Sequence, residues 1–321
     1  MDGEIEEVRL VGLPDIQEKY PDVSLSLSKV GLVGVKMPIG YISLKNKPVI
    51  LVPVFDVFID LPPTQKGIHT SRNYEIITDV LGEYVGKTYK LEDICVVVSR
   101  GLLEKNKSAT RSEVKAVGEA IFKQKTPKTK IMSYESFKIM AKAVAERKTD
   151  GSISAKKTIG IGLTGMTACP CAREAVRKIS EEEIKKLQLG KDSVRSILNK
   201  IPLATHMQRA YGMITMEIPE GEEVEATRLV RIINDSMSAS TFELLKRPDE
   251  AELVIRAAFN PKFVEDCVRY MMYYFVREFS DFPDDIRLRF KLRSMESIHQ
   301  HDMIAERATT LGEIRREINP I

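Results

Sequence analysis

Alternating apolar and polar residues in the first half of the chain predict β-strands. The clearest case is 49–61, where the alternation runs through Phe55-Asp56-Val57-Phe58-Ile59-Asp60 and a period of two predicts a strand with one buried face. Segments rich in β-branched residues predict further strands at 29–38 and 89–99. Amphipathic patterns predict helices at 112–124 and 134–147.

A polar stretch at 146–154 predicts a connection, and with it a boundary near residue 150. Beyond it the pattern predicts strands at 154–163 and 210–218, and helices at 173–187, 223–236 and 261–279. No glycine-rich phosphate loop opens any of these helices. We therefore expect an α+β fold with two modules, 1–150 and 151–321, rather than a doubly wound sheet.

The helix predicted at 261–279 has a favourable start, because Asn260 is a preferred N-cap and Pro261 suits the first helical position. Its apolar residues recur at helical spacing, which predicts that they face the core. These residues are Val264, Cys267, Val268, Met271 and Phe275.

Composition narrows the class of protein. The chain has 321 residues, of which 43% are hydrophobic and 30% charged, as in ordinary globular proteins. A net charge of +3 from 49 basic and 46 acidic residues argues against a nucleic-acid binder. No apolar run approaches the ~20 residues that span a bilayer, and the acidic start Met1–Glu7 lacks the features of a secretory signal. We expect a cytoplasmic protein with no membrane partner.

The few histidines and cysteines are concentrated in short polar signatures. All four histidines, His69, His206, His299 and His301, lie in such signatures, and two of the four cysteines form Cys169-Pro170-Cys171. Imidazole and thiolate are common ligands of Fe, Zn and Cu, so the grouping predicts a metalloenzyme. Two buried cysteines in a tight turn, or hydrogen-bonded histidines without a metal, would give the same pattern.

Two glutamates stand out by their context. Glu250 ends Leu244-Leu-Lys-Arg-Pro-Asp-Glu250, where a proline turn brings two cations and two acids together. Glu265 lies near the start of the last predicted helix, where a carboxylate can accept two parallel N–H donors from a heterocycle. A solvated charged loop and a surface acid stabilised by the helix dipole are the alternatives.

Six motifs in order resemble those of the type IB GTP cyclohydrolase family, and specifically its archaeal, iron-dependent branch of methanopterin biosynthesis. The resemblance covers nearly the whole chain, including Ser28-Lys-Val-Gly31. The motifs are Gly67-Ile-His-Thr-Ser-Arg72, Met166-Thr-Ala-Cys-Pro-Cys171, His206-Met-Gln-Arg209, Leu244–Glu250, Asn260-Pro-Lys-Phe-Val-Glu265 and Ser297-Ile-His-Gln-His301. A long charged insert at 173–204 departs from the bacterial relatives and suits the archaeal branch.

The resemblance implies a tunnelling fold of two fused modules, each an antiparallel sheet with helices on one face. It also implies a homo-oligomer, dimer or tetramer, whose sheets close into a barrel with active sites at the interfaces. One Fe(2+) per subunit, with Zn or Mn as substitutes, would be bound by Cys169, His206, Glu250 and His299. Glu265 would bind the guanine ring of GTP.

The chemistry implied is hydrolytic opening of the guanine imidazole ring at C8, release of formate, and closure to a dihydropterin. Cys169, His299, His301 and His69 are the catalytic candidates, since each step moves a proton. Arg72, Lys246 and Arg247 are candidates for contact with the phosphates, where negative charge concentrates. The archaeal resemblance implies 7,8-dihydroneopterin 2′,3′-cyclic phosphate and pyrophosphate as products. The triphosphate product of the bacterial enzymes, or a catalytically silent pterin- or purine-binding protein, is the alternative.

Overall fold

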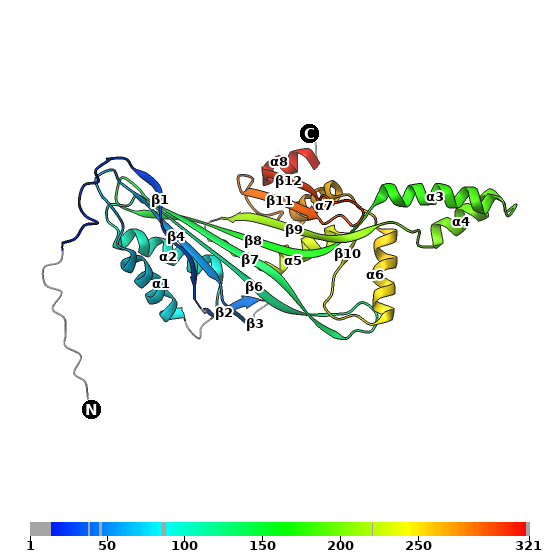
Figure 1. Ribbon diagram of the computed structural model, residues 1–321, viewed down its shortest axis with the longest axis horizontal. Coiled ribbons are helices and arrows are strands. Elements are labelled where there is room, and N and C mark those ends of the chain that lie inside the picture. Colours follow the sequence, from blue (N-terminus) through cyan, green and yellow to red (C-terminus); the bar gives the residue numbers. More distant parts are fainter. Residues whose placement is uncertain (1–13, 38, 45–46, 85–87, 220, 319–321) are drawn as a thin grey trace, which may run out of the picture.

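The centre of the protein is one antiparallel sheet, whose long strands run side by side and are strongly twisted in the computed structural model (Figure 1). The structure describes residues 14–37, 39–44, 47–84, 88–219 and 221–318; Met1–Glu7 and Pro38 lie outside them. Strands follow one another in the order β1-β4-β6-β7-β8-β9-β11-β12, and β10 pairs with β8. Their bounds are β1 Leu27–Lys36, β4 Val54–Leu61, β6 Arg111–Lys125, β7 Met132–Arg147, β8 Ile153–Ala168, β9 Met207–Ile218, β10 Ala239–Ser240, β11 Arg287–Ser294 and β12 Met303–Thr310.

Helices cover one face of this sheet. Directly paired residues of neighbouring strands point to the same side, so the buried row Ala141–Ile159–Met216–Leu288 marks the covered face. Helix α2 packs on β6, β7 and β8, α5 packs on β8 and β9, and α7 packs on β11 and β12. The bounds are α1 Thr70–Tyr84, α2 Leu91–Lys105, α5 Ala226–Ser236, α7 Val264–Glu278 and α8 Leu311–Ile318.

The strand order follows the chain on both sides of residue 150. Strands β1, β4, β6 and β7 precede this residue, and β8, β9, β11 and β12 follow it. The two sets join through the β7–β8 pairing, in which Arg147 faces Ile153. A smaller sheet of β3 (Lys47–Leu51), β2 (Ile39–Leu44) and β5 (Thr88–Tyr89) lies apart from this path. The division into two modules stays a prediction.

Two predicted helices are wrong. Segments 112–124 and 134–147 form the long strands β6 and β7, which pair along their whole length from Arg111–Glu146 to Lys125–Met132. Alanine, lysine and glutamate favour helices locally, but Phe137, Ile139 and Ala141 are buried at every second position of β7. Pairing with β8 on the other side overrides the local preference.

The strand predicted at 89–99 is wrong as well, because residues 91–105 form α2. The β-branched residues of this segment suggested a strand, but its apolar residues also recur at helical spacing. Buried on one face of the helix are Leu91, Ile94, Val98 and Leu102. The strand predicted at 49–61 is interrupted, so that β3 ends at Leu51 and β4 begins at Val54 in a different sheet. The remaining predicted strands and helices are confirmed within a few residues, and the α+β class is confirmed.

The N-cap prediction at Asn260 is also wrong. Asn260 ends α6 (Arg247–Phe259), and α7 begins at Val264 with Phe263 as its N-cap. The side-chain amide of Asn260 donates instead to the carbonyls of Met237 and Ser238, at 3.2 and 3.1 Å. The predicted core face of α7 is confirmed, since all five of its apolar residues are buried.

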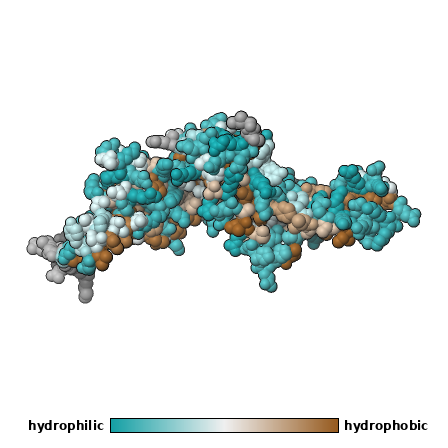
Figure 2. All heavy atoms as spheres, turned by 90° about the horizontal axis from the view of Figure 1, so that it is seen from above, coloured by the Kyte–Doolittle hydropathy of each residue, from teal (hydrophilic) through white to brown (hydrophobic). Residues whose placement is uncertain are grey.

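The charged insert forms a helical arm that projects beyond the sheet (Figure 1). It consists of α3 (Pro170–Lys185) and α4 (Lys191–Lys200), which pack on each other through Val194 and Leu198, with Val176 and Ile184 against them. Hydrophilic residues dominate the face of the molecule seen in Figure 2. Within the described ranges, no helix combines the length and apolar character needed to cross a membrane.

Candidate metal and substrate site

Four of the six motifs meet at one end of the sheet. Cys169 directly follows β8, His206 directly precedes β9, and the loop after β11 carries His299 and His301. The backbone N–H of Cys169 donates to the carbonyl of His206 at 3.1 Å. The fourth motif joins at Lys262, whose N–H donates to the carbonyl of Ala168 at 3.0 Å. Antiparallel register thus gathers segments that lie far apart in the sequence.

Cys169 is the N-cap of α3, and its Sγ accepts a hydrogen bond from the N–H of Ala172 at 3.5 Å. Pro170 occupies the first helical position, where the missing N–H costs nothing. The sulfur therefore lies at the positive end of the helix dipole. Cys171 lies in the first turn and is exposed, whereas Cys169 is half-buried.

The three histidines at this end of the sheet form a row. The ring centroids of His206 and His299 are 6.5 Å apart and the rings are perpendicular. Those of His299 and His301 are 5.1 Å apart and stacked. His206 is half-buried, whereas His299 and His301 are exposed. The three rings therefore lie next to one another, although their motifs are far apart in the sequence.

Two residues at His206 were not assigned from the sequence. Nδ1 of His206 lies 2.9 Å from Oε1 of Gln208, and Nε2 of Gln208 lies 3.2 Å from Oε1 of Glu296. The side chain of Glu296 is only 8% exposed. Gln208 lies inside a quoted motif, but only the fold brings Glu296 to it from 88 positions away.

Lys262 holds the segment that carries Glu265. Its ammonium donates to the carbonyls of Ser236, Met237 and Asp235, at 3.1, 3.2 and 3.4 Å, and lies 4.4 Å from the centre of the Tyr270 ring. Burial lowers the pKa of Lys262 below its usual value. Glu265 follows in the first turn of α7, where its side chain is exposed and free to meet a ligand.

The motif Leu244–Glu250 forms the start of α6. Asp249 is buried and accepts hydrogen bonds from the hydroxyl and N–H of Thr129 and from the N–H groups of Lys128 and Lys246. Burial opposes its ionisation, but these hydrogen bonds outweigh burial and hold the pKa of Asp249 well below its usual range. Lys246, Arg247 and Glu250 are exposed around this buried anchor.

Glu250 lies in the first turn of α6, next to Asp249, which binds Lys128 and Thr129. The other end of the helix packs at Ala168 through Leu253 and Ala257. At a rise of 1.5 Å per residue, Glu250 is about 10 Å from Ala257 along the helix axis. Cys169, His206, Glu250 and His299 do not form a group with three ligand atoms within 4.8 Å of one another, on the residues that the structure describes.

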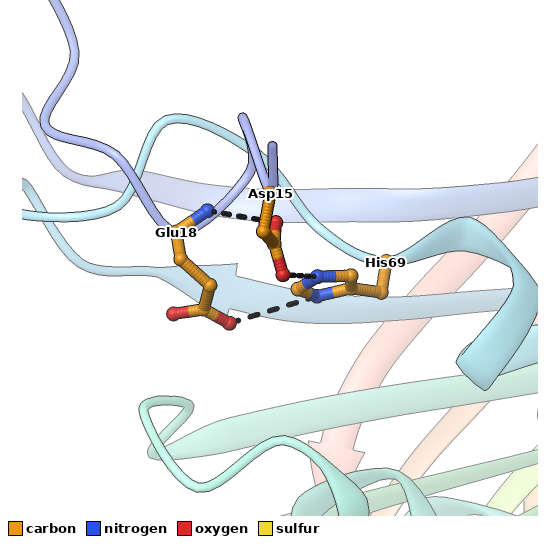
Figure 3. Close-up of side chains that lie close together, drawn as sticks. All are labelled: Asp15, Glu18 and His69. Atoms are coloured by element: carbon orange, nitrogen blue, oxygen red, sulfur yellow. Dashed lines mark hydrogen bonds and ion pairs between the residues drawn. The ribbon is translucent and has the colours of Figure 1, made fainter. Parts of the chain in front are cut away.

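The motif Gly67–Arg72 lies elsewhere in the chain. His69 directly precedes α1, with its Nε2 at 2.8 Å from Oδ2 of Asp15 and its Nδ1 at 3.7 Å from Oε1 of Glu18 (Figure 3). The hydrogen bond with His69 lowers the pKa of Asp15. Arg72 lies 3.9 Å from the same Glu18 carboxylate. Both ring nitrogens of His69 face carboxylates in the single chain.

His69 and Cys169 lie at opposite ends of the sheet. Four residues before His69, the side chain of Gln65 accepts a hydrogen bond from the hydroxyl of Ser108. Ser108 lies just before β6, and the start of β6 pairs with the end of β7, which pairs in turn with the start of β8. His69 therefore lies at the end of the sheet where β8 begins. Cys169 follows the other end of β8. At about 3.3 Å per residue, the 16 residues of this strand span roughly 50 Å. One chain alone therefore cannot bring these two motifs to one ligand.

A cavity of about 940 Å³ lies on the sheet near Arg209, in the half towards Cys169. It is bounded by the β6–β7 ribbon and α5, and the wall residues include Arg209, Arg231, Glu243, Tyr134 and Phe242. Arg209 belongs to the His206–Arg209 motif and was not assigned from the sequence. The cavity does not include Cys169, His206 or Glu265, so it is a neighbour of the motif cluster rather than its centre.

Residues 13–305 match the family described as Type I GTP cyclohydrolase folE2. The chain belongs to this family. Among similar proteins, GTP cyclohydrolase MptA 2 of Methanocella arvoryzae is 44% identical over 307 residues, which cover 95% of this chain and 99% of that protein. GTP cyclohydrolase MptA of Methanococcoides burtonii is 42% identical over 313 residues, covering 97% and 99% of the two chains. The resemblance to the type IB GTP cyclohydrolase family, inferred from the six motifs, is confirmed.

Solved structures support the fold of this folE2 family member. A uricase from Bacillus fastidious superposes with a TM-score of 0.54 at 11% identity, covering 91% of this chain and 96% of the uricase. Uricase from Arthrobacter globiformis gives 0.50 at 9% identity, covering 88% and 93%. At such low identity the likeness concerns the fold alone. It confirms the tunnelling fold.

Proposed function

We propose that this chain is a cytoplasmic GTP cyclohydrolase that acts at the start of methanopterin-type pterin biosynthesis. The observation that supports it best is the convergence of four motifs, around Cys169, His206, Glu265 and His299, at one end of a tunnelling-fold sheet. The relatives named GTP cyclohydrolase MptA match this chain over almost its full length. Motif order and these relatives thus support one activity.

The donor set fits a divalent metal. Thiolate, imidazole and carboxylate groups together suit Fe(II) or Zn(II), and we assign Fe(II) from the archaeal resemblance. Cys169 and His206, which the backbone joins directly, would hold it. Glu250 and His299 complete the set on the strength of the family resemblance, and they would have to approach these two residues when the metal binds. When bound, such a cation lowers the pKa of its water and supplies hydroxide near neutral pH for addition at C8 of guanine.

The other candidate residues would bind the substrate or transfer protons. Glu265 would accept two N–H donors of the guanine ring, since its side chain is exposed three residues after Lys262, whose N–H donates to the carbonyl of Ala168. His299 and His301, in the exposed row next to His206, would carry protons during ring opening and loss of formate. Lys246 and Arg247 would face the phosphates from the start of α6.

We further propose that the active site is shared between two copies of the chain. The edge strands β1 and β12 carry exposed apolar side chains, among them Val33 at 71% and Ile304 at 55% exposure. Exposed apolar edges favour pairing with another strand. Head-to-tail pairing of two sheets would bring His69 and Arg72 of one chain to the Cys169 end of its neighbour, which one chain cannot do.

Mixing two inactive variants tests this arrangement. Arg72→Ala and Cys169→Ala chains are each expected to be inactive, and subunit exchange between them should restore about a quarter of the wild-type activity in a dimer. Restored activity requires that the two residues act in one site but come from different chains. If the mixture stays inactive after exchange is confirmed by mass spectrometry, the shared site is refuted.

The product is proposed from the archaeal resemblance. Attack of a ribose hydroxyl on the α-phosphate would expel pyrophosphate and leave 7,8-dihydroneopterin 2′,3′-cyclic phosphate. Mass spectrometry of the reaction mixture distinguishes this product from 7,8-dihydroneopterin triphosphate. An intact triphosphate would assign the chain to the bacterial type of reaction.

The activity itself is tested with protein purified without oxygen and supplied with Fe(II). GTP should yield formate and a pterin that becomes fluorescent on oxidation. Absence of both products would refute the proposed function. Metal analysis of the same preparation separates the enzyme from the competing candidate, a silent pterin- or purine-binding protein that carries no metal.

A further inference from the structure

A chain of hydrogen bonds runs from His206 to Glu296 across two strands. Gln208 is the second residue of β9, and Glu296 lies two residues beyond β11, which pairs with β9 up to Ser294 and Ala210. The backbone N–H of Met295 donates to the carbonyl of Arg209 at 2.9 Å and extends this register. The relay residues, defined as His206, Gln208 and Glu296, are therefore placed by the sheet itself.

The chemistry of the three side chains sets the direction of the relay. A carboxylate only accepts, so the group of Gln208 that faces Glu296 at 3.2 Å is its NH₂. The amide oxygen then faces His206 at 2.9 Å, and the hydroxyl of Ser297 also donates to it at 3.5 Å. Because this oxygen can only accept, Nδ1 of His206 carries the proton.

We infer that Gln208 and Glu296 are positioning residues that hold His206 as its Nδ1–H tautomer and so keep the lone pair of Nε2 available to a metal. The inference rests on the proposed metal-dependent function. A hydrogen bond to the second nitrogen fixes both the tautomer and the rotation of a metal-binding histidine, and loss of such a partner typically weakens metal binding about 10–100-fold. Glu296 acts through Gln208, since its nearer oxygen is 3.9 Å from Nδ1.

The tautomer can be read directly in metal-free protein. With four histidines in the chain, ¹⁵N-histidine labelling gives few signals, and comparison with His206→Gln assigns the one from His206. At a pH where the ring is neutral, the wild type should show a protonated Nδ1 and an unprotonated Nε2. Gln208→Leu should shift the population towards the Nε2–H form and weaken Co(II) binding, measured by absorption titration, about 10–100-fold.

A variant in which Gln208 and Glu296 exchange side chains separates loss of the relay from a general loss of folding. In the double variant Gln208→Glu/Glu296→Gln, the carboxylate at position 208 accepts from Nδ1 of His206 and from the amide at position 296, so the tautomer and the Co(II) affinity should return. Glu217→Gln, at the far end of β9, removes a pair with Lys156 and should change neither.

Three outcomes overturn the inference. They are an Nε2–H tautomer in the wild type, an unchanged tautomer in Gln208→Leu, and no recovery of Co(II) affinity in a folded double variant. None of them depends on turnover of GTP. A protein with the expected tautomer but no cyclohydrolase activity would instead count against the proposed function.

Discussion

Replacement of Lys262 by methionine should loosen the segment that carries Glu265. Methionine keeps most of the side-chain length but cannot donate to the three carbonyls at the end of α5. Met237 keeps a donor in the Asn260 amide, whereas the carbonyls of Asp235 and Ser236 lose this partner. Because Lys262 is 7% exposed, water does not replace it freely.

The expected loss in the free energy of unfolding comes from the two carbonyls without a donor and from the lost contact with the Tyr270 ring. Each buried acceptor left without a donor costs ~1–3 kcal/mol, and the contact with Tyr270 adds ~1 kcal/mol. Relief from burying an ammonium group offsets part of this, as its lowered pKa indicates. We expect a net loss of about 3 kcal/mol. For 321 residues this lowers Tm by roughly 4–5 °C if the chain unfolds as one unit.

Urea unfolding and calorimetry of Lys262→Met measure this loss, with Arg269→Met as the control on the same helix. Arg269 is 69% exposed and pairs with Asp266, so its replacement should cost less than ~1 kcal/mol. Hydrogen exchange should be faster at the amides of 260–266 in Lys262→Met, and KM for GTP should rise. Stability within ~0.5 kcal/mol of the wild type would refute the reasoning.

The remaining predictions concern the metal, the guanine and acid stability. Cys169→Ala and His206→Ala should each lose bound metal and turnover together, whereas Cys171→Ala should keep most of both. Metal analysis and an activity assay on the same preparations measure this. If Cys171 proved essential for metal content, the assignment within the Cys-Pro-Cys motif would be reversed. Glu265→Gln should keep the metal while KM for GTP rises roughly 10–100-fold, because an amide accepts only one of the two N–H donors; unchanged KM counts against that role. The pKa of Asp249 is lowered on folding, so its contribution to stability is complete above the unfolded pKa of about 3.9 and is lost as pH falls through the lower folded value. Unfolding midpoints between pH 2 and 6 should therefore fall less steeply in Asp249→Asn than in the wild type, and equal slopes would contradict the prediction.

The sequence by itself determined the family and much of the second half of the fold. Motif spacing identified the family, and helical periodicity identified the buried face of α7 through Val264, Met271 and Phe275. These features depend on neighbouring residues, so they are visible in a single sequence. The same is true of β4, where Asp56 and Asp60 mark the outward face and burial alternates from Val54 to Leu61.

Only the tertiary structure decided which local preference prevailed in β6, β7 and α2. Segment 134–147 is rich in helix-forming residues, yet it pairs with strands on both sides, and hydrogen bonding along both edges outweighs a propensity of a few tenths of a kcal/mol per residue. Segment 91–105 is rich in valine, yet burial of one helical face against the sheet decides its state. Such contacts come from distant parts of the chain.

The same reason separates what the sequence could and could not say about the site. Cys169 and His206 could be singled out because thiolate and imidazole are rare and grouped in this chain. The partnership of Gln208 with Glu296 could not, because the register of β9 against β11 brings the two together across 88 positions. The sequence also could not show how far His69 lies from Cys169. The length of β8 sets this distance and puts the two motifs at opposite ends of the sheet.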